Sequence, residues 1–264
     1  MTDFTLKTYT HFLSILSKSG YMFQSVKDYI LKPAAKSVII RHDVDILGHT
    51  ALRLARIERD IGISSTYYFR AFKKRGFQLK FIRQVADLGH EIGYHYEDLS
   101  RCNGDMNEAI KSFEKNLGQL RKIYPVKTIC MHGSSGSRYD NRDLWIKYDY
   151  TEYGLIAEPY LDLDFNRVLY LSDVARRWNG RNIAIRDKVN SGYSFSFITT
   201  FDIFENLSSL PDHILITTHP ELWPANIYEI LIVSLYVRIH TAYKLLYRNR
   251  KVLKEINQNK FESD

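Results

Sequence analysis

The regular alternation of short apolar runs with helical segments most constrains the fold of this chain. Runs rich in β-branched and aromatic residues predict buried strands, and the segments between them place apolar residues at helical spacing. The expected strands are 37–40, 65–69, 91–95, 128–131, 155–157, 168–171, 195–199 and 214–217, and the expected helices are 51–61, 77–88 and 107–123. This order predicts parallel βα units, and hence an α/β barrel or a doubly wound sheet.

The chain is expected to form one domain with a C-terminal appendage. Its 264 residues can bury a substantial single core, and a hydrophobic fraction of 45% is ordinary for a folded protein. The boundary is predicted after Trp223-Pro224, which gives a domain over 1–224 and an appendage over 225–264.

Two carboxylates follow the first predicted strand, in Arg41-His42-Asp43-Val44-Asp45. In an extended chain Asp43 and Asp45 point to the same side, whereas His42 points away. Two acids held this close repel each other unless a cation or a shared proton compensates them. The pattern therefore predicts a metal site, with a pair of loop acids that cap the next helix as the alternative.

Three histidines follow later strands at the same predicted edge, which carries the active site in a parallel barrel. Imidazole and carboxylate are the expected ligands of Zn²⁺ or a similar divalent ion, and such an ion can activate water for hydrolysis. A spare acid could take the proton and a spare histidine could protonate the leaving group. The histidines are His95, His132 and His219.

At these residues the sequence resembles the polysaccharide deacetylase family, the NodB-homology group similar to carbohydrate esterase family 4. The resemblance runs from about Val38 to Trp223, and it is strongest to a divergent subgroup with a His-Asp-Val-Asp signature that is linked to surface-polysaccharide synthesis. It implies a distorted (β/α) barrel that removes acetyl groups from N-acetylated amino sugars with a divalent metal, for which we expect Zn²⁺.

The resemblance also implies roles for individual residues. His42-Asp43-Val44-Asp45 looks like a variant of the first family motif, which would make Asp43 the general base and Asp45 a metal ligand. The segment from Gly89 to His95 matches the approach to the second motif, which makes His95 a ligand. Thr218-His219-Pro220 looks like the last motif, whose histidine acts as general acid.

The second motif departs from the family at Leu99, which stands where a further histidine ligand is normal and cannot bind a metal. Another group must then complete the site. Glu97, Asp98 and His132 are the candidates. We favour His132 because it lies at the next strand end, and keep Glu97 as the alternative ligand.

A further set of residues is predicted to support the site or to contact substrate. Tyr170-Leu171-Ser172-Asp173 and Trp178 resemble the fourth motif, an acid and an aromatic that flank the site, although Trp178 also suits a packing role. The set comprises Arg41, His42, Glu158, Tyr160, Asp173 and Trp178.

The leading functional hypothesis is a metal-dependent hydrolase of carbon–nitrogen bonds other than peptide bonds. It would remove the N-acetyl group of an amino sugar in a surface polysaccharide or its precursor. One alternative is a catalytically silent barrel that binds glycan, which Leu99 favours. Another is hydrolysis of a different C–N amide or of an O-acetyl ester.

The appendage begins with an apolar segment, 227–247, that contains Glu229, Arg238, His240 and Lys244. These charges exclude an ordinary membrane span. We expect a helix packed on the barrel, with an amphipathic helix at a membrane surface as the alternative.

The net charge of +7 lies largely in the last part of the chain. No recognition motif accompanies it, so nucleic acid is not an expected partner. Two cysteines are too few for a disulfide framework, and the first residues lack the basic and apolar regions of a secretory signal. We therefore expect a cytoplasmic protein, with contact at the inner face of the membrane as the alternative.

Overall fold

A seven-stranded parallel sheet forms the centre of the structure, a computed structural model that describes residues 2–72, 75–179 and 183–261. The strands run in the order β5-β4-β3-β2-β7-β6, and β1 pairs with the first half of β2. They are β1 (Met22–Gln24), β2 (Ser37–Val44), β3 (Thr66–Phe69), β4 (Glu91–Tyr96), β5 (Ile129–Met131), β6 (Leu169–Ser172) and β7 (His213–Thr218).

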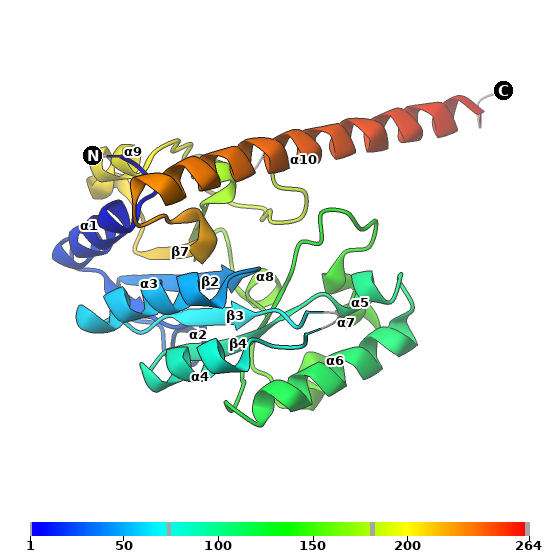
Figure 1. Cartoon of the computed structure of the whole chain (residues 1–264), viewed down its shortest axis with the longest axis horizontal. Helices are drawn as coiled ribbons and strands as arrows, with labels where there is room; N and C mark the ends of the chain where they lie inside the picture. Colours follow the sequence, from blue (N-terminus) through cyan, green and yellow to red (C-terminus); the bar gives the residue numbers. More distant parts are fainter. Residues whose placement is uncertain (1, 73–74, 180–182, 262–264) are drawn as a thin grey trace.

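Helices connect successive strands and cover the sheet (Figure 1). The α-helices are α1 (Leu6–Lys18), α2 (Val26–Leu31), α3 (Gly48–Asp60), α4 (Leu79–Asp87), α5 (Asp98–Arg101), α6 (Met106–Arg121), α7 (Leu144–Lys147), α8 (Pro159–Asp162), α9 (Thr200–Glu205) and α10 (Ile227–Phe261). Short 3₁₀ helices are η1 (Asn141–Asp143), η2 (Tyr150–Tyr153), η3 (Val174–Arg176), η5 (Leu207–Ser209) and η6 (Pro220–Leu222).

The predicted distorted (β/α) barrel is confirmed, in an incomplete form. Within the described ranges β5 and β6 end the strand order, so the sheet curls without closing. The expected strand at 155–157 is reduced to one bridge between Thr128 and Ala157 beside β5. The expected strand at 195–199 is wrong, because this segment pairs with no strand and leads into α9. The sequence did not indicate α1 or β1.

The central strand β2 presents two different faces, as the two-residue period of a strand requires. Ile39 points into the barrel with Tyr68 and Leu215, and Arg41 and Asp43 follow on the same face. The alternate residues of β2 face the covering helices. Every residue of β2 is buried, so the sheet is covered on both sides, as is usual for parallel strands.

Gly93 allows a large side chain to fill the barrel interior. A Cβ atom at Gly93 would lie 2.2 Å from Cε1 of Tyr68, the residue opposite it on β3. The Tyr68 ring therefore needs glycine at this position. Its hydroxyl reaches Thr128 Oγ1 at 3.0 Å, which satisfies the buried polar atom.

A buried carboxylate on α3 fastens the outer face of β2 and β3. Glu58 accepts hydrogen bonds from Ser65 Oγ at 2.6 Å, from the Tyr67 hydroxyl at 2.7 Å and from the Tyr9 hydroxyl. His42 Nε2 lies 2.7 Å from the same carboxylate. Burial alone would raise the pKa of Glu58, but the charge of His42 and its hydrogen bond lower it to about 2. This network holds the strand that carries Asp43.

We predict that Glu58→Gln lowers the free energy of unfolding at pH 7 by about 3 kcal/mol, because an amide cannot accept four buried hydrogen bonds. The folded pKa of about 2 lies below the ordinary value of 4.5. The contribution of the carboxylate is therefore complete above pH 4.5 and is lost as pH falls through about 2. In urea unfolding, the difference in free energy of unfolding between wild type and Glu58→Gln should become smaller as the pH is lowered. The exposed Glu205→Gln is the control, and a variant as stable as wild type at pH 7 would contradict this role.

The helix α10 begins against the barrel and then extends beyond the rest of the chain (Figure 1). Arg53 of α3 donates to both carboxylate oxygens of Glu229 at 2.9 Å, and Val233 and Val237 pack against the core. No helix within the described residues is long and apolar enough to cross a bilayer. The structure does not describe the side chains of the basic residues from 248 onward.

Candidate active site

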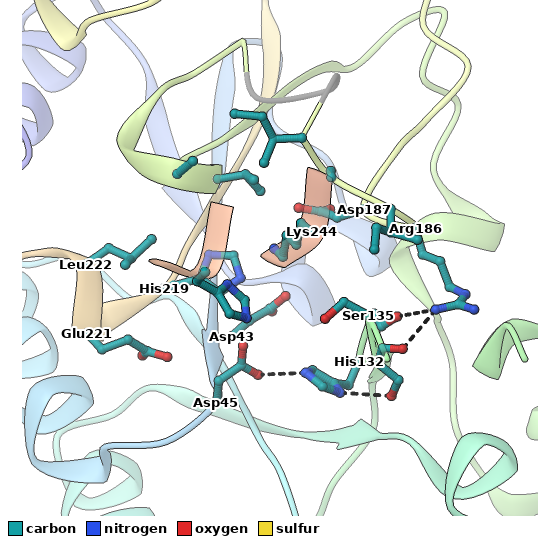
Figure 2. Close-up of a pocket in the computed structure, with 18 of the residues that line it drawn as sticks. Asp43, Asp45, His132, Ser135, Arg186, Asp187, His219, Glu221, Leu222 and Lys244 are labelled. Atoms are coloured by element: carbon teal, nitrogen blue, oxygen red, sulfur yellow. Dashed lines mark hydrogen bonds and ion pairs between the residues drawn. The ribbon is translucent and has the colours of Figure 1, made fainter. Parts of the chain in front are cut away.

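Two imidazole nitrogens approach one carboxylate oxygen at the carboxyl ends of β2, β4 and β5. Asp45 Oδ1 lies 3.5 Å from His95 Nε2 and 3.5 Å from His132 Nε2. This oxygen is buried and accepts no hydrogen bond from any described residue. The nearest cation, Arg70, has Nη1 3.8 Å away, beyond hydrogen-bond distance. Figure 2 shows Asp45 and His132 side by side at the cavity wall.

The protonation of His95 leaves a lone pair on Nε2. Its Nδ1 lies 3.0 Å from the backbone oxygen of Cys130, which can only accept, so Nδ1 carries the proton. Burial lowers the pKa of His95 to about 4 despite the nearby carboxylates, and the ring is neutral at neutral pH. Nε2 therefore faces Asp45, and also Asp43 Oδ2 at 3.7 Å, without a proton.

His132 is oriented in the same way by Glu97. Its Nδ1 lies 3.0 Å from Glu97 Oε2, and Glu97 in turn accepts from Arg70 Nη2 at 2.9 Å and pairs with Arg101. Burial alone would raise the pKa of Glu97, but the hydrogen bond from His132 and the charges around it hold this pKa well below its usual range. The other ring nitrogen, Nε2, faces Asp45 Oδ1.

Asp45 and the two histidines could hold a divalent metal ion. Ligand atoms around a tetrahedral Zn²⁺ with bonds of about 2.1 Å lie roughly 3.4 Å apart, close to the two separations from Asp45 Oδ1. Among the described residues, however, these three are not a group whose ligand atoms all lie within 4.8 Å of one another. Each histidine also donates its other ring N–H to an oxygen, an arrangement that is usual for metal-bound imidazole. Asp45, His95 and His132 are thus candidate ligands, and Glu97 hydrogen-bonds to one of them through His132 Nδ1.

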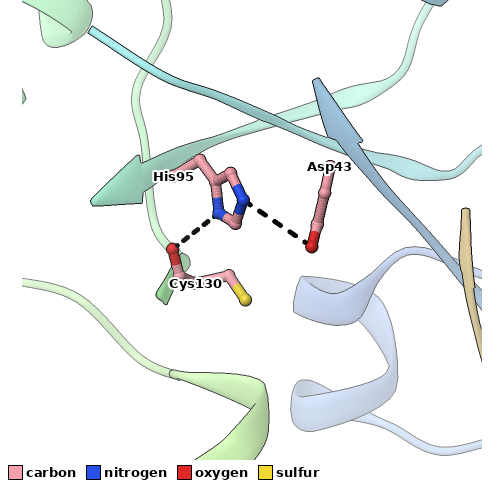
Figure 3. A group of neighbouring side chains, drawn as sticks. All are labelled: Asp43, His95 and Cys130. Carbon is pink, nitrogen blue, oxygen red and sulfur yellow. Dashed lines mark hydrogen bonds and ion pairs between the residues drawn. The ribbon is translucent and has the colours of Figure 1, made fainter. Parts of the chain in front are cut away.

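A second cluster, Asp43, His95 and Cys130, places its potential ligand atoms within 4.8 Å of one another (Figure 3). It is less suited to a metal. Burial raises the pKa of the Cys130 thiol well above its ordinary value, so a metal ion would have to displace the thiol proton to bind there. Both oxygens of Asp43 are already paired with Arg41.

Arg41 holds Asp43 in place and keeps it ionised. Arg41 Nε donates to Asp43 Oδ1 at 2.9 Å and Nη2 donates to Oδ2 at 2.8 Å, with both residues buried. Burial alone would raise the pKa of Asp43, but the charge of Arg41 outweighs it and holds the pKa well below its usual range. Arg41 thus supplies the charge beside Asp43, a supporting role consistent with its position two residues earlier on the same face.

His219 forms a pair with Asp173 across β7 and β6. Its Nδ1 donates to Asp173 Oδ1 at 2.6 Å, and the backbone N–H of His219 and Nε1 of Trp223 donate to Oδ2 at 2.9 and 2.8 Å. Burial alone would lower the pKa of His219, but the charge of Asp173 and this hydrogen bond raise it to about 10. His219 is protonated at neutral pH and points into the cavity (Figure 2).

The remaining predicted residues fall into separate places. Tyr160 lines the cavity and accepts from Arg41 Nη2 at 2.8 Å. Glu158 is fully buried, caps α8 through the Tyr160 N–H, and burial raises its pKa to about 7. His42 lies on the opposite face of β2, in the Glu58 network. Trp178 packs among core aromatics and does not reach the cavity lining.

The residues expected to replace the missing second-motif histidine have different surroundings. Leu99 is buried in the core and does not line the cavity. Asp98 accepts from the Tyr94 hydroxyl at 2.7 Å and from Ser112 Oγ at 2.6 Å, facing α6 rather than the cavity. His132 follows the neighbouring strand β5, and its Nε2 lies 3.5 Å from Asp45 Oδ1.

Several side chains at the cavity, which measures about 270 Å³, lie outside the predicted set. Arg186 donates to the carbonyls of Gly133 and Ser134 at 2.8 and 3.0 Å and so fixes the loop that follows His132. Arg70 follows a predicted strand and Glu221 lies two residues after His219 in η6, so strand ends could have indicated both. The others lie in an irregular loop or on α10, where no periodic pattern indicates them. They are Arg70, Arg186, Asp187, Glu221, His240 and Lys244.

No protein-family model matches the chain, and no curated protein sequence matches it. Among solved structures it is similar to a CE4 family pseudoenzyme from Bacillus anthracis, with 12% identity over 78% of this chain and a TM-score of 0.44. It is also similar to the Bc1960 peptidoglycan N-acetylglucosamine deacetylase, with 16% identity over 81% of this chain and 82% of that one, and a TM-score of 0.42. A Streptococcus mutans CE4 esterase has 10% identity over 86% and 90% of the two chains, and a TM-score of 0.45.

The chain spans 62% of the length of that pseudoenzyme and 65% of a mutant of it with restored activity. The solved structures it is similar to are thus CE4 deacetylases and esterases, among them a pseudoenzyme, at low sequence identity. Because the TM-scores stay below 0.5, the site residues of this chain carry the functional argument.

We predict that His132→Ala removes bound metal, because it deletes one of three ligands, whereas Cys130→Ser retains about one zinc per chain. Metal content after zinc loading and gel filtration measures both. Thermal unfolding checks that each variant is folded. Loss of zinc from Cys130→Ser with retention by His132→Ala would overturn the assignment.

Proposed function

We propose that this protein is a metal-dependent deacetylase that hydrolyses the N-acetyl group of an amino sugar in a surface polysaccharide or its precursor. The observation that supports this best is the meeting, in one cavity, of the candidate ligands Asp45, His95 and His132 with the ionised Asp43 and the protonated His219. The choice of an N-acetylated sugar rests on the resemblance of the sequence motifs.

Asp45, His95 and His132 would hold the divalent ion. When bound, it would polarise the acetyl carbonyl and lower the pKa of a water molecule. Two neutral imidazoles and one carboxylate leave a net positive charge on such a centre. That charge favours the electron-rich carbonyl oxygen of an amide.

Asp43 acts as the general base. Its carboxylate accepts a proton from the attacking water, and Arg41 fixes its orientation through two hydrogen bonds. Because Arg41 also holds the pKa of Asp43 low, the base is ionised across the neutral pH range. The position of Asp43 beside His95 puts the base next to the ligand set.

His219 acts as the general acid. Asp173 accepts a hydrogen bond from His219 Nδ1–H, so the proton on Nε2 is available for the nitrogen of the departing amine. As the C–N bond breaks, that nitrogen takes the proton from His219, and the products are acetate and the free amino sugar. The proton given to Asp43 and the proton lost by His219 balance.

We predict that Asp43→Asn lowers acetate release from N-acetylated amino-sugar oligosaccharides by about 10²-fold or more, because the base is lost while the ligand set remains. The variant should still hold about one divalent ion per chain. Asp212→Asn, at an exposed site, is the matched control. Undiminished acetate release, or oligosaccharide binding without any turnover by wild type, would contradict the proposal, the latter in favour of a silent glycan-binding barrel.

We predict that Asp173→Asn shifts the alkaline limb of the pH profile of kcat/KM downward by about 1–3 pH units. The charge of Asp173 raises the pKa of His219 and so keeps the acid protonated to higher pH. Without that charge His219 loses its proton at lower pH. Asp212→Asn should leave the limb unchanged, and a limb that does not move in Asp173→Asn would rule out His219 as the acid.

A further inference from the structure

The helix α10 carries an apolar face that the rest of the chain leaves exposed. Between 227 and 246 only one exposed residue, Arg238, is charged; the others are aliphatic or tyrosine. Leu231, Ile232 and Ile239 are exposed by 63%, 67% and 63%. The outer face of α10, as we define it, comprises Ile227, Tyr228, Leu231, Ile232, Leu235, Ile239 and Leu246, which recur at three- to four-residue and seven-residue spacing.

The opposite face of the same helix is already occupied. Val233 and Val237 pack on the core, and Ser234 Oγ accepts from Arg176 Nη1 at 3.0 Å. His240 and Lys244 continue this face along the cavity wall, and Figure 2 shows Lys244 at the cavity. The barrel therefore accounts for one side of α10 and leaves the outer face without a covering element among the described residues.

This distribution is the reverse of a helix that faces water, which exposes charged residues and buries its apolar stripe. A contiguous exposed apolar surface of this kind marks an interaction site. The stretch 227–246 would be about 30 Å long in a helix. It can lie along a surface but, as the described residues show, α10 cannot cross a bilayer.

The basic residues of α10 indicate what kind of surface its outer face binds. Residues 248–255 contain four lysines and arginines against one glutamate, and they follow the apolar face on the same helix. Two copies of α10 paired in parallel would bring these basic ends together, and in antiparallel pairing each basic end would lie on the apolar half of its partner. An anionic lipid surface can bind both the apolar face and the basic residues. The apolar side chains would be buried at the boundary with the acyl chains, and the basic side chains would pair with the headgroups.

We propose that α10 lies in the plane of an anionic membrane surface, with its outer face in the boundary between headgroups and acyl chains. The inner face of the helix would stay on the barrel and continue to wall the cavity. The cavity would then lie about one helix diameter, roughly 10 Å, from the lipid. Resting on the proposed function, this position suits an amino sugar presented at the membrane surface.

Sedimentation of the full chain with vesicles tests this proposal. The protein should pellet with vesicles of phosphatidylglycerol and phosphatidylcholine, less so at high salt, and remain in solution with phosphatidylcholine alone. Leu235→Glu combined with Ile239→Glu should reduce the bound fraction by about tenfold or more. Ile146→Glu, at a site 82% exposed on α7, is the matched control and should bind as wild type does.

Three outcomes would overturn the proposal. The wild-type chain could stay in solution with anionic vesicles, or the double variant could bind them as well as the control does. The chain could instead form a dimer in analytical ultracentrifugation that the double variant dissociates, without vesicle binding, so that a second copy covers the outer face. Acetate release from a soluble substrate should be equal in the double variant and the wild type, so failure here is separable from failure of the deacetylase.

Discussion

The arrangement of the site depends on Asp45, whose buried Oδ1 lies 3.5 Å from His95 Nε2 and 3.5 Å from His132 Nε2. A cation beside this oxygen would stabilise its negative charge. Hydrogen bonds at Nδ1 set the orientation of both imidazoles. The partner of His95 is the Cys130 carbonyl, and the partner of His132 is the Glu97 carboxylate. Arg41 pairs with Asp43 at 2.8 Å and Arg70 pairs with Glu97 at 2.9 Å, whereas Arg70 stays 3.8 Å from Asp45 Oδ1.

The same strand serves stability and chemistry on its two faces. On the inner face Arg41 and Asp43 form a closed, buried ion pair that leads to the cavity. On the outer face His42 enters the hydrogen-bond network of Glu58, which joins α1, α3 and β3. Because the same strand carries Asp43 and His42, the position of Asp43 depends on the packing of β2 against α3. The strand is apolar from Val38 to Ile40 and then carries three consecutive polar residues, Arg41, His42 and Asp43.

The sequence predicts the parts of the site that follow from strand ends. The carboxyl ends of parallel strands meet, so Asp43, Asp45, His95, His132 and His219 could be placed together without coordinates. The pairing of Asp173 with His219 could not, because it depends on the register of β6 beside β7. The cavity wall from α10 and the loop with Arg186 has no periodic signature. The wrong strand at 195–199 has a similar cause: Phe195 and Phe197 alternate as in a strand, yet their stacked rings, 5.2 Å apart, pack within a loop that pairs with no strand.

X-ray absorption at the zinc edge of the zinc-loaded protein tests the ligand assignment most directly. Asp45, His95 and His132 provide only oxygen and nitrogen, so the account predicts a first shell at about 2.0–2.1 Å with no sulfur. A sulfur neighbour at about 2.3 Å would identify Cys130 as a ligand and contradict the account.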